Sequence, residues 1–116
     1  MAEVEWIILS EYARIDNGLL TLIHGGWNYI VVQSLPSQIP LFISFALAVT
    51  TARKSVPARV SILDEDGRVL HYIDVEIRVF GPPLRSGMSR RAVCTAQVLF
   101  SFFASGVYVI EVDCEG

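Results

Sequence analysis

The sequence has few of the residues that build metal sites and nucleophilic centres. It contains two histidines and two cysteines among 116 residues. His24, His71, Cys94 and Cys114 show neither the Cys-x-x-Cys nor the His-x-x-x-His spacing of common zinc sites. His24-Gly25-Gly26 is similar to the oxyanion loop of lipases, but the Gly-x-Ser-x-Gly elbow that such enzymes need is absent. We therefore expect no catalytic residue, no metal and no cofactor, and a protein that is not an enzyme.

Positive charge is scarce as well. Nine Lys and Arg residues face twelve Asp and Glu residues, which gives a formal net charge of −3. Binding to a nucleic acid backbone needs a basic surface that displaces counterions. We therefore expect no nucleic acid partner. Arg85, Arg90 and Arg91 are gathered in a predicted exposed loop over residues 84–91.

The chain also lacks a long apolar run. The longest one, over residues 41–49, is about half of the ~20 residues that a membrane-spanning helix needs. The start of the chain, Met1 to Glu5, is acidic where a signal peptide carries positive charge. We expect no membrane partner and a cytoplasmic location, in which Cys94 and Cys114 remain thiols.

Alternating apolar and polar residues dominate what is present. From His71 to Phe80, the odd positions, which hold His71 and four apolar residues, fall on one face and the even positions on the other, as in a half-buried strand. Asp64-Glu65-Asp66-Gly67 precedes this run and supplies the Asp-Gly step of a tight turn. Residues 57–80 therefore predict a β-hairpin.

The same pattern extends over the rest of the chain, and no segment shows helical periodicity with caps. Further strands are predicted over residues 4–15, 19–23, 28–32, 41–51, 92–103 and 107–114. Residues 33–40, with Pro36 and Pro40, are predicted to be a surface connection. About seven strands indicate a single all-β domain over residues 1–116, an antiparallel β-sandwich that is immunoglobulin-like in outline.

The composition leaves a surplus of apolar residues. The apolar fraction is 53% and the charged fraction 18%, against roughly 45–50% and ~25% in typical soluble chains. The mean hydropathy is +0.49. Monomers rarely expose large apolar patches, so we expect a homo-oligomer or a partner protein.

These observations favour a non-enzymatic module that binds a partner or itself through sheet edges and an apolar face. Strand 41–51 has one bulky and one small face, and the small face lets another surface approach closely. We predict Phe42 and Ala46 on that face, and Val107 and Val109 on the last strand, as partner-binding residues. Arg85, Arg90 and Arg91 complete this predicted surface as a polar rim.

A second hypothesis is a small-molecule receptor. Its pocket would open near His24, Trp27 and the loop over residues 81–91, and Arg90 would hold an anionic group of the ligand. The two hypotheses remain open from the sequence.

The order of several motifs resembles a family of small uncharacterised bacterial proteins. These motifs are residues 8–13, Asp16-Asn17-Gly18, Gly25-Gly26-Trp27, Leu35-Pro36, residues 63–68 and residues 105–108. The resemblance implies a compact β-sandwich and brings no activity, cofactor or catalytic residue with it. The family pattern continues with one more strand, which implies here a sheet edge that another chain could complete.

Overall fold

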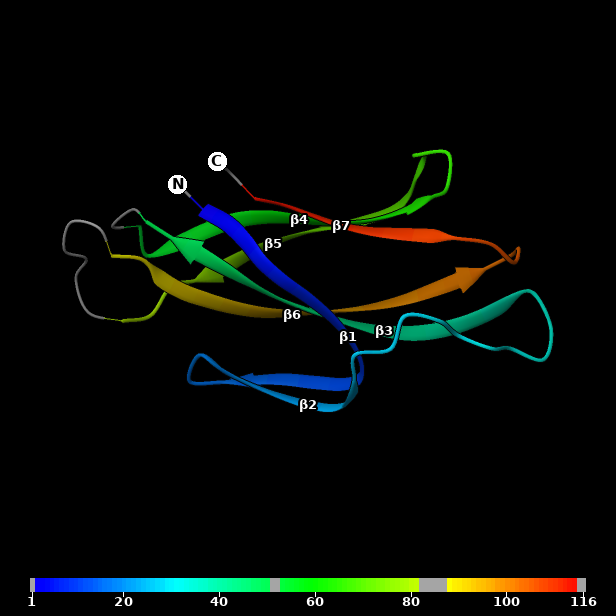
Figure 1. Cartoon of the computed structure of the whole chain (residues 1–116), viewed down its shortest axis with the longest axis horizontal. Coiled ribbons are helices and arrows are strands. Elements are labelled where there is room, and N and C mark those ends of the chain that lie inside the picture. The colour runs from blue at the N-terminus through cyan, green and yellow to red at the C-terminus, as the bar shows by residue number, and fades with distance from the viewer. Residues whose placement is uncertain (1, 51–52, 82–87, 115–116) are drawn as a thin grey trace.

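The computed structural model describes residues 2–50, 53–81 and 88–114, which contain seven strands and no helix (Figure 1). The strands are β1 (Ala2–Asp16), β2 (Leu19–Gly25), β3 (Ser37–Val49), β4 (Ser55–Asp64), β5 (Val69–Arg78), β6 (Arg90–Phe102) and β7 (Tyr108–Cys114). Nothing in this described part is a helix long and apolar enough to cross a membrane.

The strands form two antiparallel sheets. One has the order β2-β1-β3-β6 and the other the order β5-β4-β7. This confirms the predicted all-β sandwich. The likeness to an immunoglobulin domain is limited to the two-layer outline, because the first strand here pairs with the third, whereas the immunoglobulin order is ABED and CFG.

The core lies between the two sheets and is built from alternate residues of the central strands. Strand β3 contributes a row of fully buried side chains that includes Ile43, Phe45 and Leu47. The buried side chains of β4 and β5 belong to the same cluster. Ile77 is buried while its neighbours Glu76 and Arg78 are exposed, which confirms the alternation predicted for this hairpin.

The turn of the β4–β5 hairpin is held by one carboxylate. Asp64 Oδ1 accepts hydrogen bonds from the backbone amides of Asp66 and Arg68 at 3.0 and 2.9 Å. Gly67 has a φ of 85°, a conformation that side chains with a Cβ rarely adopt. The Asp-Gly step therefore performs the role predicted from the sequence.

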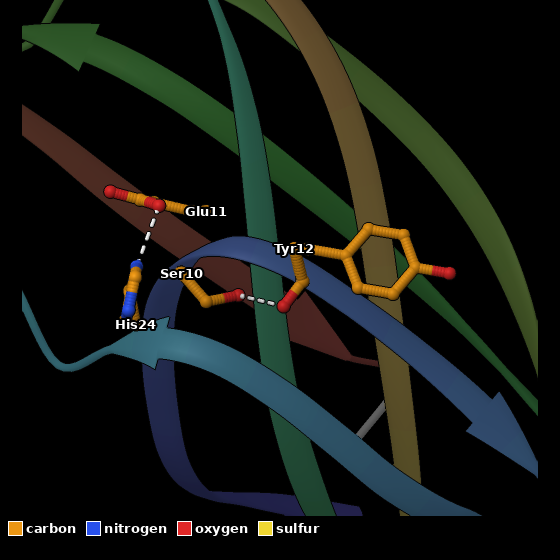
Figure 2. Close-up of polar contacts among 4 residues, drawn as sticks. All are labelled: Ser10, Glu11, Tyr12 and His24. Atoms are coloured by element: carbon orange, nitrogen blue, oxygen red, sulfur yellow. Dashed lines mark hydrogen bonds and ion pairs between the residues drawn. The ribbon is translucent and has the colours of Figure 1, made fainter.

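Strand β1 bends sharply at Ser10 and pairs with a different strand on each side of this bend. Residues up to Ser10 pair with β3, and residues from Ser10 onward pair with β2. Figure 2 shows the bend, where the Ser10 hydroxyl donates to the backbone carbonyl of Tyr12 at 3.1 Å. Beside it, His24 Nδ1 lies 2.8 Å from Glu11 Oε2, which links β2 to β1.

Beyond the bend, residues 11–25 form a hairpin arm that folds beneath β3 and β6, on the side away from the three-stranded sheet (Figure 1). Strand β2 contacts β6 although it pairs only with β1. At the tip of the arm, a Cβ added to Gly18 would lie 3.1 Å from the Phe80 ring. The arm thus covers the outer face of the four-stranded sheet.

Burial of the outer face of the four-stranded sheet contradicts the prediction that Ala46 is a partner-binding residue. Ser44 and Ala46, on the small face of β3, are 0% exposed. This small face is covered within the chain itself: Ala46 lies between Trp6 of β1 and Val93 of β6, and the hairpin arm folds over the same side of the sheet (Figure 1). Ala46 therefore cannot contact a partner.

Two predicted boundaries are wrong. Residues 28–32 form no strand, because β2 ends at Gly25 and Gly26 has a φ of 95°.

Residues 37–40 belong to β3, although they include Pro40, which pairs with Leu99 of β6. On its other side β3 has no strand partner here among the described residues, since β1 has already left it at Phe42. A proline is tolerated in a strand where one side makes no ladder hydrogen bonds.

Ala46→Leu tests whether the outer face of the four-stranded sheet is closed around Ala46. Added methyl groups at a fully buried site force neighbouring side chains to shift, so we expect a loss of about 1–3 kcal/mol in the free energy of unfolding. Urea denaturation measures it. Ala104→Leu, at an exposed position, is the matched control and should stay within about 0.5 kcal/mol of wild type. Equal stability of both variants would contradict the closed arrangement.

Candidate functional site

A pocket of about 430 Å³ lies between the two sheets, at the end where β1 leaves β3. Its lining comes from all the elements that meet there: Leu9 of β1, Trp27, Asn28, Tyr29, Ile30, Val32 and Leu35 of the connection after β2, Ile39 and Leu41 of β3, Ile62 of β4, Phe102 of β6, residues 104–107, and Tyr108 and Ile110 of β7. We call this site the end pocket.

The end pocket exists because the two sheets differ in width here. After Ser10, β1 turns away and the four-stranded sheet is reduced to β3 and β6, while β7 continues opposite the gap. The connection after β2 partly fills the gap. Gly26 anchors it by donating its backbone amide to the Leu9 carbonyl at 2.8 Å, and Trp27 packs against the core.

Aromatic rings form one wall of the end pocket. Phe102 lies edge to face against Phe100 and Tyr108, with ring centroids 4.7 and 4.9 Å apart. The Tyr108 hydroxyl donates to the Ala104 carbonyl at 2.6 Å, which satisfies its polar end and holds the β6–β7 turn against β7. Such edge-to-face packing fixes ring orientation, so the wall is preorganised.

The chemistry of the end pocket is apolar. None of its lining residues is Asp, Glu, Lys, Arg or His. Around it, Tyr29 is 77% exposed, Val31 85%, Phe103 75% and Val107 62%. Large apolar side chains with this exposure are therefore gathered at one end of a small domain, where monomers rarely expose large apolar patches.

Strand β7 adds an open sheet edge to this end. Among the described residues it pairs only with β4, so the backbone groups that point away from β4 have no strand partner. Val109 is exposed on its outer face, next to Val107. The structure therefore places the two predicted valines together, beside the end pocket.

The other predicted partner-binding residues lie elsewhere. Phe42 is half-buried and packs against Tyr12, with ring centroids 5.5 Å apart. Arg91 belongs to β6, not to a loop, and its guanidinium donates to both carboxylate oxygens of Glu5 at 2.7 and 3.2 Å. These hydrogen bonds lower the pKa of Glu5. Arg85 lies outside the described residues.

The three residues of the alternative ligand site are not brought together. Trp27 lines the end pocket, whereas His24 sits on the hairpin arm, exposed and bonded to Glu11. Arg90 starts β6 and donates to the Arg53 carbonyl at 2.8 Å, while Phe102 at the other end of β6 reaches the end pocket. At about 3.4 Å per residue, these ends of β6 are on the order of 40 Å apart.

The two cysteines are separate thiols in the structure. Burial raises the pKa of Cys94, so this thiol stays protonated at neutral pH and is a weak nucleophile. Burial also raises the pKa of Cys114, whose sulfur lies 3.2 Å from the Ala2 carbonyl. Within the described ranges, no three His, Cys, Asp or Glu side chains gather in a way that could hold a metal ion.

Sequence reasoning missed the connection after β2 as the main contributor to the site. The sequence signal is Tyr29-Ile30-Val31-Val32, an apolar run without alternation between glycines and prolines, which predicts a strand over residues 28–32. A run that is apolar at successive positions but bounded by strand breakers is also compatible with a connection that plugs a gap.

The fold and the site together define a small all-β sandwich with an apolar pocket at one end. The chain matches the model of a family of unknown function, DUF6941, over residues 5–116, and it belongs to this family. This confirms the resemblance to an uncharacterised family. Comparison with curated proteins and with solved structures gives no match.

Filling the end pocket tests its apolar character. The neutral dye Nile red should gain fluorescence with the wild-type protein, because the dye emits strongly in an apolar cavity. Ile110→Trp places a larger side chain in the end pocket and should reduce this gain several-fold. Ile23→Trp, on the exposed face of the hairpin arm, is the control and should leave it unchanged. If Ile110→Trp and Ile23→Trp bound the dye equally well, the result would contradict an apolar cavity lined by Ile110.

Proposed function

We propose that this chain is a non-enzymatic protein-interaction module that binds another polypeptide through the end pocket and the exposed apolar residues around it. A single observation carries the proposal: an uncharged pocket is surrounded by Tyr29, Val31, Phe103 and Val107, all of which expose most of their surface. Apolar anchors in a preformed pocket provide most of the binding energy at protein interfaces.

A polypeptide is favoured over a nucleic acid by charge. The net charge of −3 opposes binding to phosphate groups, and the end pocket has no basic lining residue. The same absence argues against the anionic ligand of the second hypothesis, which would need Arg90 near Trp27.

An apolar small molecule is the second candidate. The volume of about 430 Å³ lies within the range of roughly 300–1,000 Å³ that ligand pockets occupy. However, the apolar surface extends past the end pocket to Val31 and Phe103, which do not line it. A small molecule would leave these side chains in water, and a protein partner would cover them.

A bacterial cytoplasm is the location that we propose for this activity. The two separate thiols of Cys94 and Cys114 support it, because disulfides are rare where glutathione and thioredoxin keep thiols reduced.

Site-specific crosslinking tests the proposed function. The photoreactive amino acid p-benzoylphenylalanine is introduced at position Val107, and irradiation of the native cells should give a discrete covalent adduct. Mass spectrometry then identifies the second polypeptide, which is either a partner or a second copy of the 12.9 kDa chain.

The same amino acid at position Thr21 is the matched control, because Thr21 is exposed on the hairpin arm, away from the end pocket. We expect no discrete adduct there. Absence of an adduct at position Val107, or the same adducts at both positions, would overturn the proposed function.

A further inference from the structure

We infer that the partner binds by adding an antiparallel strand to the open edge of β7, and that the added segment is basic at its N-terminal half and apolar at its C-terminal half. This inference rests on the proposed function and specifies the chemistry of the partner. It follows from the position of the edge, from the charges along it and from the end pocket beside it.

The edge of β7 and the end pocket are parts of one surface. β7 lies over β1, as the contact of Cys114 Sγ with the Ala2 carbonyl shows at one end. At the other end β1 has turned away, and Tyr108 and Ile110 line the end pocket there. A strand paired with β7 would therefore direct alternate side chains into the end pocket, as in other complexes formed by strand addition.

The outer face of β7 changes from apolar to acidic along the strand. Val107 and Val109 are followed by Glu111 and Asp113, and all four are exposed. Side chains directly opposite one another in an antiparallel pair interact, and opposite charges are favourable there. A strand on this edge should place apolar residues opposite the valines and basic residues opposite the acids.

The neighbouring strand β4 offers these two acids a single cation, and that cation is shared. Glu111 is opposite Ser61, which carries no charge. Asp113 is opposite Arg59 and interacts electrostatically with it, but the same guanidinium donates to both carboxylate oxygens of Asp74 at 2.7 and 3.1 Å. The acidic half of β7 therefore favours cations from the opposite side, where the added strand would lie.

A second copy of β7 is a poorer occupant than such a segment. Residues 108–114 contain no Lys or Arg, so no register of β7 against itself puts a cation opposite Glu111 or Asp113. Pairing centred on Glu111 would bring two carboxylates face to face, and like charges at directly opposite positions are destabilising. The charge pattern thus selects a different segment.

Two peptides test the inference by fluorescence anisotropy. The first, Lys-Val-Arg-Ile-Val-Leu-Val, places Lys and Arg opposite Asp113 and Glu111 in the antiparallel register, and Val opposite each of Val109 and Val107. The second has Glu at both basic positions. The wild-type protein should bind the first peptide about three- to tenfold more tightly, the range expected for two exposed cross-strand charge pairs. Hydrogen exchange at the β7 amides that face away from β4 should slow on binding.

The variant Glu111→Lys/Asp113→Lys is the matched charge swap. Both positions are exposed, so the fold should persist, and the variant should prefer the second peptide. The variant Glu11→Lys/Asp16→Lys changes the same charge at two exposed positions of the hairpin arm, in the other sheet, and is the control that should leave the preference of wild type unchanged.

Failure of this inference is distinct from failure of the proposed function. Binding of neither peptide, equal binding of both, or unchanged preference in the charge swap would each overturn strand addition to β7. An adduct at position Val107 would still support a protein partner in those cases. If that adduct proves to be a second copy joined through β7, the inferred chemistry of the partner is also overturned.

Discussion

The bend of β1 at Ser10 is the constraint on which the rest of the structure depends. A strand cannot pair with β3 and fold back over its outer face at the same residues, so β1 does the first up to Ser10 and the second beyond it. The hairpin arm closes one face of the four-stranded sheet, and the departure of β1 opens the end pocket. The closed outer face of the four-stranded sheet and the open end pocket therefore both result from the bend of β1 at Ser10.

The small residues of β3 make this arrangement possible. Ser44 and Ala46 leave room for the arm, and the Ser44 hydroxyl donates to Thr95 Oγ1 at 3.0 Å, which satisfies a polar group that is otherwise buried. Toward the other end, Glu5 of β1 and Arg91 of β6 form an ion pair across β3. A bulky residue in place of Ser44 or Ala46 would not fit on this buried face, because protein interiors are close-packed.

Polar and apolar surfaces are separated along the molecule. The ion pair of Glu5 and Arg91 lies near the start of β6, and the end pocket lies where β6 ends. β7 joins the two regions, with valines at the end pocket and acids farther along. A partner that follows β7 would meet both chemistries in a fixed order, which provides specificity in addition to the affinity of the apolar anchors.

The sequence by itself determined the strands and the two faces of most of them. Alternation in β5 and the Asp-Gly turn at Gly67 are local properties, since a period of two and a positive φ are readable from adjacent residues. The exposure of Val109 could be predicted for the same reason. Only the tertiary structure decided which element covers Ala46, why Pro40 is allowed in β3, and that Trp27 and Arg90 lie at opposite ends. These outcomes depend on where β1 leaves β3, a contact between distant segments that no local pattern encodes.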